Sequence, residues 1–211
     1  MAAEPTTLPA AAAGTVALGD LTVNRMGFGA MRLTGRGVWG DPPDRETAIG
    51  VLRRAVELGV NLIDTADSYG PALNEELVAD ALHPYDGVVV ATKGGLRHPA
   101  PGSWERDGRP ETLRESLEGS LRRLRVESID LYQLHSVDPR VPLEESVGTL
   151  AELQRAGKIR HLGLSNVDAR QLAAARRIVE VVSVQNRYSL VDRHHETVLE
   201  ACEREGIAFL P

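Results

Sequence analysis

The sequence predicts an α/β fold, an incomplete (β/α)8 TIM barrel with an N-terminal β-hairpin. Strand-like apolar runs alternate with amphipathic segments of helical period, which is typical of βαβ units around a parallel sheet. No Gly-x-Gly-x-x-Gly pattern follows the first run, and this favours a barrel over a doubly wound sheet. The 211 residues suffice for one large core. A complete eight-unit barrel, however, usually needs about 250 residues.

The N-terminal residues are expected to form a tail and a hairpin. Residues 1–13 are rich in Ala and Pro and lack the basic and apolar regions of a signal peptide, so we expect a disordered tail. Residues 15–23 alternate in polarity around Gly19 and Asp20, which indicates a hairpin with a tight turn. The barrel is expected to occupy residues 14–211.

Seven strands and six helices are expected in alternation. The strand-like runs are residues 25–30, 60–64, 88–92, 129–135, 161–165, 181–185 and 207–210. Between them, apolar residues recur every three or four positions, the period of an amphipathic helix. These stripes are Ala48, Val51, Leu52, Ala55 and Leu58 in the first helix; Leu113, Leu117, Leu121 and Leu124 in the third; Leu143, Val147, Leu150 and Leu153 in the fourth; Leu172, Ala175 and Ile178 in the fifth; and Val198 and Cys202 in the sixth. The second helix, over residues 74–82, is shorter.

Residues that typically start, cap or end helices lie at the expected helix boundaries. Pro110 lies near the first turn of the third helix, Asp168 is placed to cap the fifth, and Gly206 follows the sixth. The last strand reaches Pro211, so the seventh helix, eighth strand and eighth helix have no sequence to form them. The barrel is therefore expected to be a fragment or to be open, with two unpaired strand edges.

Composition excludes several classes of function. The net charge is −6 with both signs interspersed, so no basic patch suggests nucleic acid or an anionic membrane. No apolar run approaches the roughly 18 residues of a membrane span. The single cysteine, Cys202, excludes an intrachain disulfide, which favours a reducing, cytoplasmic location. The oligomeric state stays open.

Four ionisable residues follow successive strands. Asp64 ends the second strand and Tyr69 follows it, Lys93 follows the third strand, and His135 ends the fourth. Barrels of parallel strands place their chemistry at this rim, so the four residues form one candidate active site. Taken singly, each has an ordinary structural explanation such as a cap, a packed aromatic or a solvated charge. Their joint placement favours the catalytic interpretation.

The four groups suit acid–base chemistry. A tyrosine has an ordinary pKa of about 10, and the ammonium of Lys93 would lower that pKa. Asp64 would hold Lys93 charged, and His135 could orient a substrate oxygen through a hydrogen bond. General acid–base catalysis of this kind contributes about 10²–10⁴ in rate.

Five segments carry a family resemblance. They are residues 64–70, Asp-Thr-Ala-Asp-Ser-Tyr-Gly; 91–93, Ala-Thr-Lys; 131–135, Leu-Tyr-Gln-Leu-His; 157–166, Gly-Lys-Ile-Arg-His-Leu-Gly-Leu-Ser-Asn; and 184–186, Val-Gln-Asn, followed by Tyr188. Over residues 14–211 the chain resembles the aldo-keto reductase family. Residues 35–43 and 80–85 look somewhat like its pyridoxal-reductase-like branch.

The resemblance implies an NADPH-dependent reduction of an aldehyde or ketone to an alcohol. Tyr69 would be the general acid, Lys93 and Asp64 would tune it, and His135 would orient the carbonyl. The implied cofactor-binding residues are Gly29, Met31, Asp64, Ser165, Asn166 and Gln185. The family binds the adenosine phosphate after its eighth strand, which this sequence lacks, so NADPH rather than NADH rests on resemblance alone.

The substrate is expected to be a small carbonyl compound. Trp39 and Trp104 lie in long loops after the first and third strands, where they could form an aromatic wall with His135 or simply pack the loops. The His194-His195-Glu196 run lacks the spacing of a His-Glu-x-x-His zinc site, so no metal is expected.

Two other interpretations remain open. The chain could be a non-catalytic, cofactor-binding module of the same fold, because the final part of the cofactor site is missing. It could also be a barrel hydrolase or aldolase that uses Lys93 as a Schiff-base amine, although this would leave Tyr69, Asn166 and Gln185 unexplained.

Overall fold

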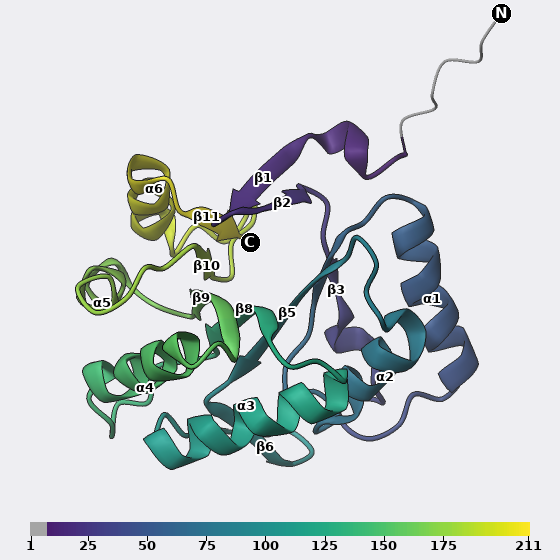
Figure 1. Ribbon diagram of the computed structural model, residues 1–211, viewed down its shortest axis with the longest axis horizontal. Helices are drawn as coiled ribbons and strands as arrows, with labels where there is room; N and C mark the ends of the chain where they lie inside the picture. The colour runs from purple at the N-terminus through teal and green to yellow at the C-terminus, as the bar shows by residue number, and fades with distance from the viewer. Residues whose placement is uncertain (1–7) are drawn as a thin grey trace, which may run out of the picture.

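The computed structural model describes residues 8–211. Its centre is a seven-stranded sheet in which every neighbouring pair is parallel. The strands, in spatial order, are β11 (Ala208–Leu210), β10 (Ser183–Gln185), β9 (Ile159–Ser165), β8 (Ile129–Leu134), β5 (Val89–Gly94), β4 (Leu62–Asp64) and β3 (Phe28–Gly29). The sheet curls with its helices on the outer face (Figure 1). This confirms the predicted incomplete barrel.

Within residues 8–211, six α-helices connect the strands. They are α1 (Arg45–Glu57), α2 (Leu73–Leu82), α3 (Pro110–Leu124), α4 (Leu143–Arg155), α5 (Ala169–Ala175) and α6 (Glu196–Glu205). Asp168 caps α5 as predicted, and its carboxylate accepts the backbone N–H of Gln171 at 2.8 Å. The fifth helix is shorter than predicted, because it ends at Ala175 and leaves Ile178 38% exposed in the following turn.

Two apolar cores hold the sheet. The larger one packs the helices against the outer face of the strands. The smaller one lies inside the barrel, where Leu18 and Val23 of the hairpin meet Leu62, Ala91 and Leu131. The predicted hairpin is present as β1 (Thr15–Leu18) and β2 (Leu21–Asn24), and it closes the N-terminal end of the barrel. The C-terminal ends of the strands lie at the opposite rim, where barrels of this kind place their active sites.

Three local expectations differ from the structure. Residues 96–106 form a second hairpin, β6 (Leu96–Ala100) and β7 (Ser103–Arg106), where the sequence suggested a loop because Pro and Gly interrupt it. The first barrel strand shrinks from residues 25–30 to β3, since Ala30–Leu33 turns into the short 3-10 helix η2.

The third difference concerns the expected disordered tail. Residues 11–13 form the 3-10 helix η1, and Ala10 is buried and donates its N–H to the carbonyl of Leu58 at 2.9 Å. This small side chain lies close to Gly59, so residues 8–13 are part of the folded unit. Residues 1–7 lie outside the described part of the chain, and their disorder stays a prediction.

Candidate active site

Lys93 lies at the centre of the site. Strand β5 turns its side chain into the barrel, where it is fully buried. Its Nζ donates to Oδ2 of Asp64 at 2.7 Å and to the carbonyl of Thr65 at 2.9 Å. Burial lowers the pKa of Lys93, but the charges of Asp64 and Tyr69 outweigh this effect and raise the pKa overall. The group is therefore held as an ammonium, which disfavours the Schiff-base interpretation because a free amine is the nucleophile.

Tyr69 lies in the turn after β4, against the lysine. Its N–H donates to the carbonyl of Ala66 at 3.2 Å, and its side chain is buried. The Nζ of Lys93 lies 5.2 Å from the centre of the phenol ring. Burial raises the pKa of Tyr69, and the opposing effect of Lys93 is smaller. The expectation of a lowered pKa was wrong, because desolvation of the phenolate exceeds the attraction of one ammonium.

His135 completes the cluster. Its ring meets that of Tyr69 edge to face, with centroids 5.7 Å apart. Burial and the nearby charge of Lys93 hold the pKa of His135 well below its usual range, so the imidazole is neutral. Its Nδ1 lies 3.4 Å from Oγ of Ser68. If this hydroxyl donates to Nδ1, the proton resides on Nε2, which can then donate to a substrate oxygen.

A cavity of about 820 Å³ adjoins these groups. Its lining includes all six residues expected to bind a cofactor, together with Tyr69 and His135. These six are Gly29, Met31, Asp64, Ser165, Asn166 and Gln185. Lys93 is absent from the lining and reaches the cavity only through Asp64 and Tyr69. The fold thus brings the residues expected to bind the cofactor together with the expected catalytic residues Tyr69 and His135 on one cavity wall.

Side-chain amides organise the wall of the cavity where the sequence leads us to expect a cofactor. Gln185 donates from Nε2 to Oδ1 of Asp64 at 3.0 Å, and Asn166 donates from Nδ2 to the carbonyl of His135 at 3.0 Å. Gln133 also donates to Asp64 Oδ1, at 3.3 Å. Sequence reasoning missed Gln133, although it lies on β8 two positions before His135, which directly follows that strand. That spacing places both side chains on the same face.

The two tryptophans lie elsewhere. Neither Trp39 nor Trp104 lines the large cavity; instead they pack around His98. Trp104 stacks on that imidazole with centroids 3.8 Å apart, and Trp39 meets it edge-on at 5.0 Å. Trp104 lines a second cavity of about 580 Å³. Among residues 8–211, no cluster of three or more potential metal-ligating side chains is arranged to hold a metal ion.

Comparison with known proteins assigns the chain to a protein family. The model of the Aldo/keto reductase family matches residues 25–211. The chain belongs to the aldo/keto reductase family. A protein of Schizosaccharomyces pombe named as an oxidoreductase is 51% identical over 202 residues, covering 96% of this chain and 66% of the relative. Pyridoxine 4-dehydrogenase of Escherichia coli is 42% identical, with coverage of 93% and 71%.

Solved structures agree with this aldo/keto reductase assignment. Glycerol dehydrogenase from Gluconobacter oxydans superposes with a TM-score of 0.87 at 35% identity, covering 94% of this chain and 63% of that protein. An aldo/keto reductase from Klebsiella pneumoniae, solved with NADP and acetate, gives a TM-score of 0.76 at 27% identity, with coverage of 92% and 66%. The chain thus spans about two thirds of the length of these relatives. No helix within residues 8–211 has both the length and the apolar character that crossing a membrane requires.

Proposed function

We propose that the protein reduces an aldehyde or ketone to an alcohol with a reduced nicotinamide cofactor. The observation that carries this proposal is the protonated phenol of Tyr69 on the cavity wall, backed by the buried ammonium of Lys93, which Asp64 holds. The family assignment and the oxidoreductase names of two relatives support the same reaction.

The cavity fits the cofactor's reactive end. Its volume of about 820 Å³ falls within the usual range of ligand sites. Ser165, Asn166 and Gln185 offer hydroxyl and amide groups that match the donor and acceptor of a nicotinamide carboxamide. When bound, the reduced nicotinamide would supply the hydride that reaches the carbonyl carbon.

The residues of the chain perform the proton chemistry. Tyr69 is a neutral phenol at physiological pH, so it can donate its proton to the carbonyl oxygen as negative charge develops there. The ammonium of Lys93 stabilises the phenolate that remains, and Asp64 fixes the position of that ammonium. Neutral His135 donates a hydrogen bond to the same oxygen and orients the carbonyl.

Replacing Tyr69 with Phe tests the role of the phenol. The proton donor is lost while the ring and its packing stay, so turnover should fall by about 10²–10⁴ and cofactor affinity should remain within about twofold. Cofactor fluorescence measures binding, and loss of nicotinamide absorbance with an aldehyde panel measures turnover. Cofactor binding without turnover in the wild-type protein would instead support the non-catalytic module, and unchanged turnover in Y69F would remove Tyr69 from the mechanism.

NADPH is the cofactor we propose, by family resemblance and by the NADP bound to the Klebsiella pneumoniae relative. A cytoplasmic location is also part of the proposal. It rests on the single cysteine, Cys202, which allows no intrachain disulfide. Titration with NADPH and NADH in parallel tests the cofactor preference directly.

A further inference from the structure

The second cavity opens beside the catalytic rim. Its 580 Å³ lie between the β6–β7 hairpin and the loop that follows β8. Asn166 lines both cavities, and Ser136, which follows His135 in the chain, lines the second one. A molecule whose carbonyl reaches Tyr69 and His135 can therefore extend into this space, away from the residues expected to hold the nicotinamide.

Strand pairing sets which side chains face the cavity. In the hairpin, Arg106 pairs with Leu96, and both line the cavity together with Trp104. Glu105 pairs with Arg97, and Glu105 also borders the cavity whereas Arg97 does not. Residues two positions apart on a strand share a face. Trp104 and Arg106, two positions apart, thus present an indole and a guanidinium on one surface.

The indole is held in a fixed orientation. One face of Trp104 stacks on His98, with ring planes 14° apart, while the residue remains 41% exposed. His98 is itself 3% exposed, and neither of its ring nitrogens has a hydrogen-bond partner among the described residues. Its contribution here is the flat packing surface that supports Trp104, leaving the outer face of the indole open to a ligand ring.

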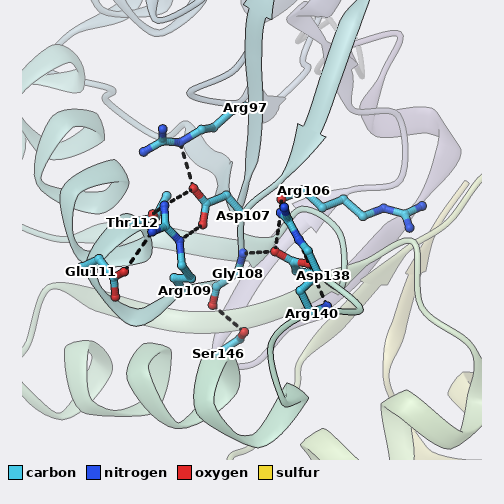
Figure 2. Close-up of polar contacts among 10 residues, drawn as sticks. All are labelled: Arg97, Arg106, Asp107, Gly108, Arg109, Glu111, Thr112, Asp138, Arg140 and Ser146. Carbon is cyan, nitrogen blue, oxygen red and sulfur yellow. Dashed lines mark hydrogen bonds and ion pairs between the residues drawn. The ribbon is translucent and has the colours of Figure 1, made fainter.

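Three other arginines of this region, of which Arg140 lines the cavity, have carboxylate partners. Figure 2 shows Arg97 and Arg109 on Asp107 and Arg140 on Asp138. Arg106 forms no ion pair within residues 8–211, and in Figure 2 its guanidinium points away from both aspartates. Its backbone carbonyl accepts a hydrogen bond from Arg140, which anchors the strand without using the Arg106 side chain.

The neighbouring carboxylate, that of Asp138, already has hydrogen-bond and ion-pair partners. The carboxylate of Asp138 is 1% exposed and accepts from the N–H of Gly108 at 3.3 Å and from Nε of Arg140 at 2.9 Å. Arg140 lowers the pKa of Asp138 to about 2, so the pair stays ionised and neutral as a unit. Ser146 donates to the carbonyl of Gly108 at 2.6 Å, which ties the loop to α4. The guanidinium of Arg106 is the cationic group of this cavity that remains available to a ligand, and the carboxylate of Glu105 borders the same space.

We propose that this cavity is a substrate subsite for the carboxylate of an aromatic aldehyde or ketone. The ring stacks on Trp104, the carboxylate pairs with Arg106, and the carbonyl reaches Tyr69. One unpaired guanidinium matches a monoanion in charge and in planar geometry. A phosphate dianion would exceed that charge and meet the nearby Asp138. This subsite rests on the proposed carbonyl reduction and specifies its substrate class.

Arg106→Gln tests the subsite with two substrates that differ in charge. The purified protein is assayed with 4-carboxybenzaldehyde and with its methyl ester, methyl 4-formylbenzoate. Loss of a charge-assisted hydrogen bond should raise KM for the acid about tenfold, with kcat and the ester's KM changed less than about twofold. Arg97→Gln is the matched control: it removes a half-exposed guanidinium that does not line the cavity, and KM for the acid should stay within about twofold.

A binding measurement separates the subsite from the reaction. Quenching of tryptophan fluorescence by 4-(hydroxymethyl)benzoate and by its methyl ester reports binding without turnover. The wild-type protein should bind the acid about tenfold more tightly than the ester, and R106Q should abolish the difference. Equal binding of acid and ester, or equal KM changes for both aldehydes in R106Q, would overturn the subsite. Arg106-dependent binding in a wild-type protein that reduces neither aldehyde would refute the proposed function and leave the subsite standing.

Discussion

Asp67 is a half-buried acid whose ionisation weakens the fold as pH rises toward neutral. It lies in the loop between Asp64 and Tyr69, and its N–H donates to the carbonyl of Lys93 at 3.2 Å. Its Oδ1 is buried and has no hydrogen-bond partner within residues 8–211. Burial, together with the nearby carboxylate of Glu75, raises the pKa of Asp67 from 3.8 to about 7.

The sign of the stability effect follows from proton linkage. Between pH 3.8 and about 7 the folded state keeps a proton that the unfolded state releases, so the free energy of unfolding falls as pH rises through this window. One pKa unit corresponds to about 1.4 kcal/mol, which sets an upper bound of about 4 kcal/mol for the whole loss. Because part of the Asp67 side chain is solvent-accessible, we expect about 2 kcal/mol.

Asp67→Asn removes this titration at constant shape. Urea denaturation of both proteins from pH 4.5 to 8 measures the free energy of unfolding. The wild-type protein should lose about 2 kcal/mol relative to the variant between those limits, and the difference should level off near pH 8. The control is Asp86→Asn, which removes an exposed carboxyl without an ion pair in the described structure. A wild-type minus D67N difference that stays constant with pH would refute the reasoning.

Two further predictions concern the site and the hairpin. The pKa of Tyr69 lies above 10 and that of His135 well below 6.5. The pH profile of kcat/KM for carbonyl reduction should therefore show no inflection from the phenol between pH 7 and 9, and none from the imidazole. An activity loss that follows a phenol pKa below 9 would contradict this prediction. Gly19 has φ +62°, and a Cβ there would clash with the imidazole of His161. Gly19→Ala should therefore cost about 1–3 kcal/mol in thermal unfolding with kcat unchanged, whereas an unaltered Tm would show that the hairpin turn is not tightly packed.

Sequence reasoning could bring the candidate catalytic groups together because their placement depends on local pattern. A residue that ends a parallel strand must lie at the carboxyl rim, so Asp64, Lys93 and His135 could be brought together before any coordinates. The hairpin at residues 15–23 was equally accessible, since its turn and alternation are local. The helix starting after Asp168 was recognisable from its cap.

The substrate side was less accessible. Pro99 and Gly102 made residues 96–106 resemble a loop, yet the chain pairs with itself across them. That register is what places Trp104 and Arg106 on one face and moves Trp104 onto His98. Sequence alone cannot show that Arg106 lacks a carboxylate, because Asp107 and Asp138 lie near several arginines in the chain and the folded geometry decides which of them they pair with.

Hydrophobic period, strand ends and caps thus specified the barrel and the set of reactive groups, since each follows from residues close together in the chain. The balance between burial and neighbouring charges, which sets the pKa of each of these groups, is decided only by the tertiary structure. Burial of the Tyr69 ring outweighs the charge of Lys93 and reverses the expected direction of its pKa. Desolvation depends on every atom packed around a group, and those atoms come from distant parts of the sequence.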